Sequence, residues 1–146
     1  MRCFSIIVAF LFCANALAQD QFVAFDPTLT KVEYFGTQAE VTLVFGIEPG
    51  YHIQDVQNVD QGLIPTKVIW YDPTLVKSHR FEIPFYETVT LGKDMQTVIS
   101  NWFKITVRLD LANLEELTGH VYYQACDDKR CFFPREAGFE VSFNDD

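Results

Sequence analysis

Cys126 and Cys131 are the two residues whose type and spacing most directly suggest chemistry. The four residues between them, 127–130, are all charged, and a strand-like segment runs into Cys126. A tight reversal over these four residues would bring the two Cβ atoms near the separation of about 3.8 Å that a disulfide requires. The pair is therefore a candidate for thiol–disulfide exchange.

The alternative is that a bridge between Cys126 and Cys131 only pins a hairpin. Closing a loop of about six residues stabilises a fold by only about 2 kcal/mol in the chain-entropy model, against about 4 to 5 kcal/mol for a bridge across most of a domain. A domain of this size also has enough chain to build a core without a bridge. Together with the expected exposure of the pair on a loop, these arguments favour a reactive pair. A non-catalytic immunoglobulin-like binding module with a structural disulfide remains the alternative.

Local charge does not decide how reactive the thiols are. Lys129 and Arg130 favour a thiolate, whereas Asp127 and Asp128 oppose it, so the two effects cancel. The pair is framed in sequence by four aromatic residues, Tyr122, Tyr123, Phe132 and Phe133. An apolar frame disfavours a free thiolate, so the pair should react selectively, with a partner that brings its own activated cysteine.

The first eighteen residues, 1–18, are typical of a secretory signal peptide. Arg2 provides the basic start, residues 4–14 form an apolar run, and residues 16–18 match a small-x-small cleavage site. The apolar run is shorter than the roughly 20 residues of a membrane-spanning helix. We therefore expect export to the periplasm or out of the cell, without direct membrane insertion.

The mature chain, 19–146, should form one domain. Cys3 and Cys13 leave with the signal peptide, so Cys126 and Cys131 are the cysteines that remain, and in an oxidising compartment they usually pair. The net charge of −9 argues against nucleic acid as a partner.

The elements that must position the cysteines read as strands. Apolar residues alternate with polar ones in the segments 41–47, 103–111, 121–125 and 137–143. Shorter candidates are 22–25, 31–34, 67–71 and 87–91. With turn signals between these segments, we expect an all-β, immunoglobulin-like antiparallel β-sandwich of about seven to nine strands. One helical pattern, leucines at three-residue spacing in 111–117, is long enough for one or two turns.

Metal and cofactor sites are not expected. His52, His79 and His120 lie far apart in sequence and lack the spacing of metal ligands. No phosphate-binding loop or Ser-His-Asp signature is recognisable, so the chemistry would depend on the two thiols.

The cysteine segment resembles the N-terminal periplasmic domain of the thiol:disulfide interchange protein DsbD, a family that includes free-standing disulfide-bond-corrector-like domains. The strongest match is Tyr-Gln-Ala-Cys-x4-Cys-x-x-Pro at 123–134. Two weaker matches are Pro-Gly-Tyr-His at 49–52 and Pro-Phe-Tyr-Glu at 84–87, the latter similar to the family's cap loop. The likeness covers nearly the whole mature chain, although only the cysteine segment is specific.

The resemblance implies an immunoglobulin-like sandwich whose cysteine pair relays electrons between thioredoxin-fold proteins, an activity of the protein-disulfide reductase type. It implies that Cys131 forms the mixed disulfide with partners and that Cys126 resolves it. It also implies that Phe85 caps the disulfide, with Tyr86 beside it. From the residues alone, Phe85 is equally well explained as a core anchor.

Three features depart from the family's pattern. The cysteines are separated by four residues rather than the five of the best-known member. His52 and Gln54 stand where that member has tyrosines. No transmembrane or thioredoxin domain follows, which implies an electron donor acting in trans, such as a membrane protein.

Overall fold

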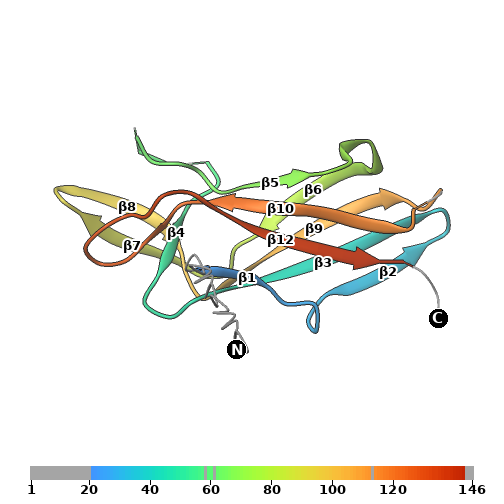
Figure 1. The fold of residues 1–146 in the computed structure, drawn as a ribbon, viewed down its shortest axis with the longest axis horizontal. Coiled ribbons are helices and arrows are strands. Elements are labelled where there is room, and N and C mark those ends of the chain that lie inside the picture. Colours follow the sequence, from blue (N-terminus) through green and yellow to red (C-terminus); the bar gives the residue numbers. More distant parts are fainter. Residues whose placement is uncertain (1–20, 58, 61, 113, 144–146) are drawn as a thin grey trace, which may run out of the picture.

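The strands of this chain pair antiparallel in three sheets and build a β-sandwich of the immunoglobulin-like type (Figure 1). The computed structural model describes residues 21–57, 59–60, 62–112 and 114–143, so the expected signal peptide, 1–18, lies outside the described residues. The described part of the chain contains twelve strands and one short 3-10 helix, η1 (Pro73–Leu75). The expected all-β fold class is confirmed, with more strands than the seven to nine expected.

Each sheet combines segments that lie far apart in sequence. The largest sheet has the order β1 (Val23–Phe25), β3 (Gln38–Ile47), β9 (Trp102–Asp110), β6 (Val76–Glu82), with β2 (Lys31–Phe35) also paired to β3. The facing sheet has the order β12 (Arg135–Ser142), β10 (Glu116–Tyr123), β5 (Lys67–Trp70). The third has the order β11 (Ala125–Cys126), β4 (His52–Gln54), β8 (Asp94–Ile99), β7 (Tyr86–Leu91). Among the residues described, no helix has the length and apolar character that crossing a membrane requires.

The core lies between the largest sheet and the facing sheet, and the alternation in sequence marks the residues that fill it. On β3, Leu43 and Phe45 are fully buried, and on β9 the ring of Phe103 stacks on Phe45 with 5.2 Å between ring centroids. The facing sheet contributes Val121 and Tyr123, which are also fully buried. Because successive side chains of a strand point to opposite faces, one buried face appears as a period of two, and this prediction is confirmed.

Three strands, β4, β6 and β8, were not expected from the sequence, because they are short or rich in polar residues. The helical pattern in 111–117, expected to give one or two turns, forms no helix among the described residues. Leu117 lies in β10 opposite Val141 of β12, and a single turn closed by the Leu114 N–H and the Leu111 carbonyl precedes that strand. Strand pairing buries Leu117 more completely than an isolated helical turn would, and short helices are marginal without such packing.

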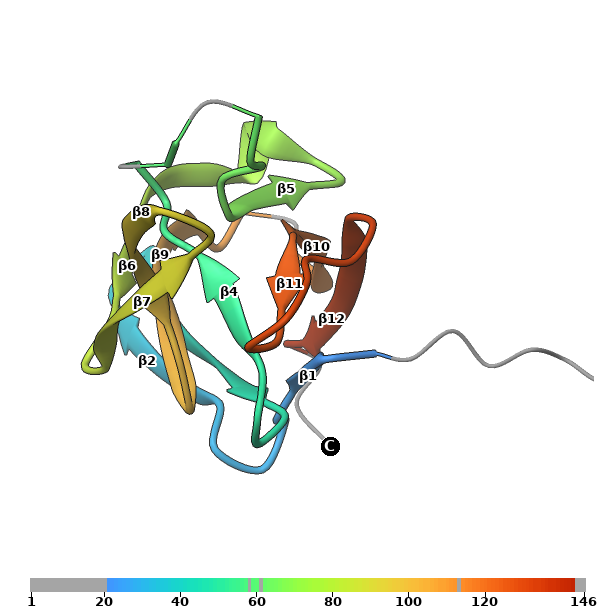
Figure 2. The ribbon, with the colours of Figure 1, turned by 90° about the vertical axis from the view of Figure 1, so that its left-hand side faces the viewer.

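The third sheet lies at one end of the sandwich. Figure 2, which looks along the long axis from that end, shows β4 and β11 between the largest sheet and the facing sheet, with the β7–β8 hairpin beside them. The hairpin turn contains Gly92 with a φ of 67°, a left-handed conformation that glycine adopts without strain. This end of the molecule carries both cysteines.

Candidate functional site

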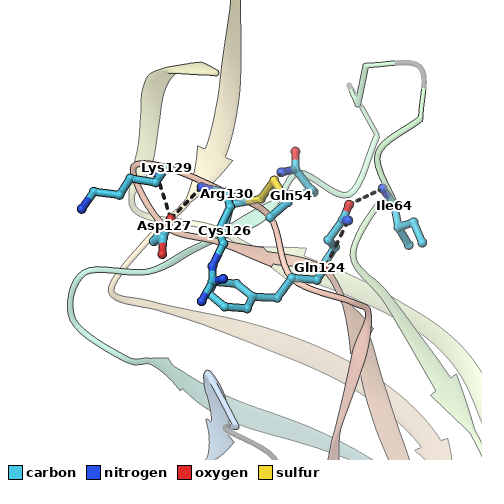
Figure 3. The surroundings of a disulfide bond; sticks show 9 residues. Gln54, Ile64, Gln124, Cys126, Asp127, Lys129 and Arg130 are labelled. Carbon is cyan, nitrogen blue, oxygen red and sulfur yellow. Dashed lines mark hydrogen bonds between the residues drawn. A yellow bond between two sulfur atoms is a disulfide. The ribbon is translucent and has the colours of Figure 1, made fainter. Parts of the chain in front are cut away.

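A tight turn brings Cys126 and Cys131 together. Cys126 ends β11, and the two cysteines form an isolated antiparallel bridge with their Cα atoms 3.9 Å apart and a disulfide between them. Asp127 closes the turn: its carboxylate accepts hydrogen bonds from the backbone N–H groups of Lys129 at 2.8 Å and Arg130 at 2.7 Å (Figure 3). These two bonds lower the pKa of Asp127, so the turn is most stable with the carboxylate ionised.

The two cysteines differ in exposure. Cys126 is fully buried, whereas Cys131 is half-buried. The expectation that the pair is exposed on a loop is therefore wrong for Cys126. The reason is that β11 pairs with β4, which places Cys126 opposite His52 inside the third sheet rather than on a free loop.

Cys131 opens onto a shallow pocket of about 340 Å³. An apolar part of its lining, Phe132, Phe133 and Pro134, lies next to Cys131, and the polar part consists of Gln124, Arg130 and Arg135. Phe133 is 84% exposed, which is unusual for a phenylalanine, and its ring forms an apolar surface beside Cys131. A partner protein that approaches the disulfide from this side reaches Cys131 first.

The aromatic residues expected to frame the pair divide into two groups. Phe132 packs against Phe22, and the Arg130 guanidinium lies over its ring at 4.8 Å from the centroid. Tyr123 instead belongs to the core, where its hydroxyl accepts a hydrogen bond from the Val23 N–H at 3.3 Å. Tyr122 lies on the opposite face of β10, under the Lys67 ammonium.

Two glutamines hold the disulfide segment to neighbouring parts of the chain. Gln54 is almost fully buried, and its Nε2 donates a hydrogen bond to the Sγ of Cys126 at 3.2 Å. Gln124 accepts a bond from the Ile64 N–H at 3.0 Å and donates one to the Phe132 carbonyl at 3.3 Å (Figure 3). The sequence alone suggested no role for either glutamine. Two features could have pointed to them: Gln54 stands where the best-known member of the resembled family has a tyrosine, and Gln124 lies within the cysteine motif.

His52 is the direct cross-strand neighbour of Cys126. The side chain is 8% exposed, and burial lowers its pKa, an effect that Glu87 and Asp127 oppose. The imidazole is therefore neutral at pH 7. Across the residues described, no group of three or more His, Cys, Asp or Glu side chains is placed to hold a metal ion.

An acidic cleft lies beside the buried cysteine. It has a volume of about 420 Å³, and His52 lies in its lining. Its carboxylates are Glu48, Glu87, Asp127 and Asp128, and no lysine or arginine lines it. The cleft and the Cys131 pocket thus flank the turn of residues 127–130.

Phe85 and Tyr86 lie at the start of β7, in the same end of the molecule as the cysteines. Two strands, β8 and β4, separate β7 from the cysteine strand β11 in this sheet. The Phe85 ring is 41% exposed and packs edge-on against Trp102, and the Tyr86 hydroxyl donates to Asp55 at 3.2 Å. Burial and the Asp55 carboxylate raise the pKa of Tyr86. Shielding of the disulfide by Phe85 and Tyr86 stays a prediction.

Solved structures share this architecture. The N-terminal periplasmic domain of ScsB from Proteus mirabilis matches with a TM-score of 0.59 and 11% identity, over 77% of this chain and 44% of that chain. The N-terminal domain of Neisseria meningitidis DsbD in the reduced form matches with a TM-score of 0.48 and 21% identity, over 80% and 85% of the two chains. The GAE domain of yeast GGA1 matches with a TM-score of 0.40 and 11% identity, over 88% and 96%.

These comparisons bear on the fold. The chain shares its fold with the N-terminal periplasmic domain of ScsB and spans less than half of that chain. The immunoglobulin-like fold that the sequence resemblance implied is therefore confirmed. No protein-family model matches the chain, and no curated protein matches it in sequence.

Proposed function

We propose that this chain is an exported thiol:disulfide interchange domain that passes reducing equivalents between thioredoxin-fold proteins through Cys126 and Cys131. The observation that carries the proposal is the unequal exposure of the pair, with Cys126 buried and Cys131 half-buried beside the exposed ring of Phe133. A relay needs one accessible sulfur for its partners and one protected sulfur that closes the disulfide again. A purely structural bridge has no need of this asymmetry.

Reduction of the pair begins at the accessible sulfur. A thiolate of the reduced donor attacks the Sγ of Cys131, which forms a mixed disulfide and breaks the bond to Cys126. Cys126 leaves as a thiolate and takes up a proton. The second thiol of the donor then attacks the donor sulfur of the mixed disulfide, so the donor departs oxidised and Cys131 is released as a thiolate.

Transfer to a client runs the same exchange in the other direction. The Cys131 thiolate attacks the client's disulfide and releases one client thiolate. Cys126 then loses the proton that it took up and, as a thiolate, attacks the Sγ of Cys131, which restores the bridge and releases the second client thiolate. Two electrons pass in each half of the cycle, and no cofactor is needed for the chemistry.

The surroundings of the pair support protein partners rather than small thiols. The apolar surface of Phe132 and Phe133 beside Cys131 suits contact with another protein. In this proposal Phe85 and Tyr86 shield the disulfide until a partner docks. Residues 1–18 direct export, and a disulfide of this kind persists in an oxidising compartment such as the periplasm.

Trapping of mixed disulfides tests the proposal. The Cys126→Ser and Cys131→Ser variants would each be mixed, in reduced form, with a thioredoxin whose resolving cysteine is replaced and whose remaining cysteine is activated by an aromatic disulfide reagent. We expect Cys126→Ser to form a stable adduct and Cys131→Ser to form little, because Cys126 is buried. Non-reducing gels and mass spectrometry measure the yields.

The matched control is a protein without the thioredoxin fold that carries one activated surface cysteine. Faster adduct formation with thioredoxin than with this control supports an exchange role. Equal, slow reaction of both variants with both proteins would instead support the structural hairpin disulfide. Reversed yields would contradict the assignment of Cys131 as the attacking cysteine.

A further inference from the structure

We propose that Gln54 is a catalytic residue of the exchange reaction, because its side-chain amide stabilises Cys126 as the leaving thiolate. The inference rests on the proposed function, since it concerns the sulfur that departs when a partner attacks Cys131. It assigns a task to a residue at which this chain departs from the pattern of the family that its cysteine segment resembles.

The contact joins two buried groups. The Nε2 of Gln54 lies 3.2 Å from the Sγ of Cys126, and the two residues are 1% and 0% exposed. Gln54 belongs to β4, the strand that pairs with β11, so the contact crosses between neighbouring strands. Water does not compete for the amide at this depth, and a hydrogen bond to a charged atom is stronger there than at the surface.

The backbone of Gln54 is held on both sides. Its N–H donates to the Gln124 carbonyl at 3.3 Å, and its carbonyl accepts the hydroxyl of the buried Thr66 at 2.6 Å. On β8, Val98 lies opposite Gln54 in the sheet. The amide donor is therefore in place before the reaction, and little reorganisation is needed as charge develops on sulfur.

The reaction strengthens this contact. In the oxidised protein the Sγ of Cys126 is a neutral disulfide sulfur, which accepts hydrogen bonds weakly. When a partner thiolate bonds to the Sγ of Cys131, the electron pair of the broken S–S bond remains on Cys126, which becomes an anion. Charge-assisted hydrogen bonds are about twice as strong as neutral ones, so Gln54 stabilises the departing sulfur more than the starting disulfide.

The same contact distinguishes the two sulfurs. Among the hydrogen bonds between described residues, none has the Sγ of Cys131 as its acceptor, whereas the Sγ of Cys126 has the Gln54 amide. Attack at Cys131 therefore expels the sulfur that has a donor. Attack at Cys126 would expel a sulfur without one, besides having to reach a buried atom. An amide does not titrate, so this preference holds at any pH at which the protein is folded.

The decisive variant is Gln54→Met, which keeps the length of the side chain and removes the donor. The matched control is Gln96→Met, because Gln96 is a partly buried glutamine of the same sheet, on β8, and lies outside the cysteine turn and the two pockets beside it. Two quantities would be measured: the rate constant for reduction of the disulfide by dithiothreitol, and the ionisation of the Cys126 thiol by ultraviolet thiolate absorbance in a Cys131→Ser background.

We expect Gln54→Met to lower the Cys126 thiolate fraction at neutral pH by about tenfold, which is the lower end of what a hydrogen bond to a charged group contributes. Reduction by dithiothreitol should slow severalfold, because a thiol that is less acidic leaves more slowly. Gln96→Met should change both quantities little. Equal effects of the two substitutions on both quantities would overturn the inference.

A second variant, Gln54→Glu, covers the case in which methionine prevents folding. An ionised carboxylate cannot donate to sulfur, whereas a protonated carboxyl group can. The rate of reduction relative to the wild type should therefore rise as the pH is lowered. A ratio that does not change with pH would count against a donor role, and failure of both variants to fold would mark Gln54 as structural.

Failure of this inference is distinguishable from failure of the proposed function. Neither dithiothreitol reduction nor thiol ionisation requires a thioredoxin-fold partner. If trapping with thioredoxin fails and Gln54→Met still slows reduction, the relay is wrong and the role of Gln54 stands. If trapping succeeds and Gln54→Met behaves like Gln96→Met, the relay stands and Gln54 has no catalytic part.

Discussion

The middle of the sandwich and its cysteine-bearing end are built in different ways. In the middle, β3 and β9 pair over nine residue pairs, from Gln38 opposite Asp110 to Gly46 opposite Trp102. At the end, β11 pairs with β4 over two residue pairs, and Cys131 is joined by a single bridge. The middle repeats one kind of contact, whereas the end depends on individual side chains such as Asp127 and Gln54.

This difference separates stability from reactivity. Repeated apolar burial in the middle supplies most of the free energy of folding, so the end is free to carry groups that burial does not favour. Neutral His52, the turn carboxylate of Asp127 and the amide of Gln54 are examples. Substitutions in the two regions should therefore affect different measurements.

The largest effect is expected from Phe45→Ala in the middle. Phe45 is fully buried and stacks on Phe103, and truncation of a buried phenylalanine costs about 3 to 5 kcal/mol of unfolding free energy. Urea denaturation of the oxidised protein measures the loss. The rate of reduction by dithiothreitol under native conditions should stay unchanged.

The control for this prediction is Phe133→Ala, which removes a ring that is 84% exposed. Its effect on unfolding should be within about 0.5 kcal/mol, the usual range for a surface substitution. A change in reduction rate for Phe45→Ala as large as its change in stability would show that the two regions are not separable.

An intermediate effect is expected from Phe85→Ala at the end. If the ring caps the disulfide, its removal should speed reduction by dithiothreitol severalfold and speed exchange with a thioredoxin-fold partner less, because a docked partner displaces the ring anyway. The ring is 41% exposed, so the loss of stability should be small.

Tyr71→Ala provides the comparison, since Tyr71 is an exposed aromatic residue outside the third sheet. Identical rates of reduction in Phe85→Ala and the wild type would refute the cap. A stability loss comparable to that of Phe45→Ala would instead assign Phe85 to the core.

The smallest effect concerns the pH dependence of stability at His52. Burial lowers its pKa in the folded state below the unfolded value of 6.5. Above that pH neither state binds the proton, so the residue is neutral in both. As the pH falls through 6.5 towards the folded pKa, the unfolded state is protonated first and stability is lost.

His52→Gln removes this titration, so the variant should lose less stability than the wild type when the pH falls from about 7.5 to about 5.5. Urea unfolding at the two pH values measures the difference, and His79→Gln, at an exposed histidine, is the control. A steeper loss of stability in His52→Gln than in the wild type would mean that the sign is wrong.

The amino-acid sequence by itself determined the elements of the middle. In β3, β9, β10 and β12 the period of two reports directly which face is buried, because the geometry of a strand sends successive side chains to opposite sides. The sequence also determined which residues can do chemistry, since Cys126 and Cys131 are the cysteines that follow the expected signal peptide.

Only the tertiary structure decided how the chemistry is arranged. Cys126 is buried because β11 pairs with β4, and its sulfur meets Gln54, 72 positions away in the sequence. The polar strands β6 and β8 form because they complete sheets begun by other segments, not because their own patterns favour strands. A local sequence pattern indicates local geometry. The burial of Cys126, its contact with Gln54 and the formation of β6 and β8 depend instead on pairing between segments that lie far apart in the sequence.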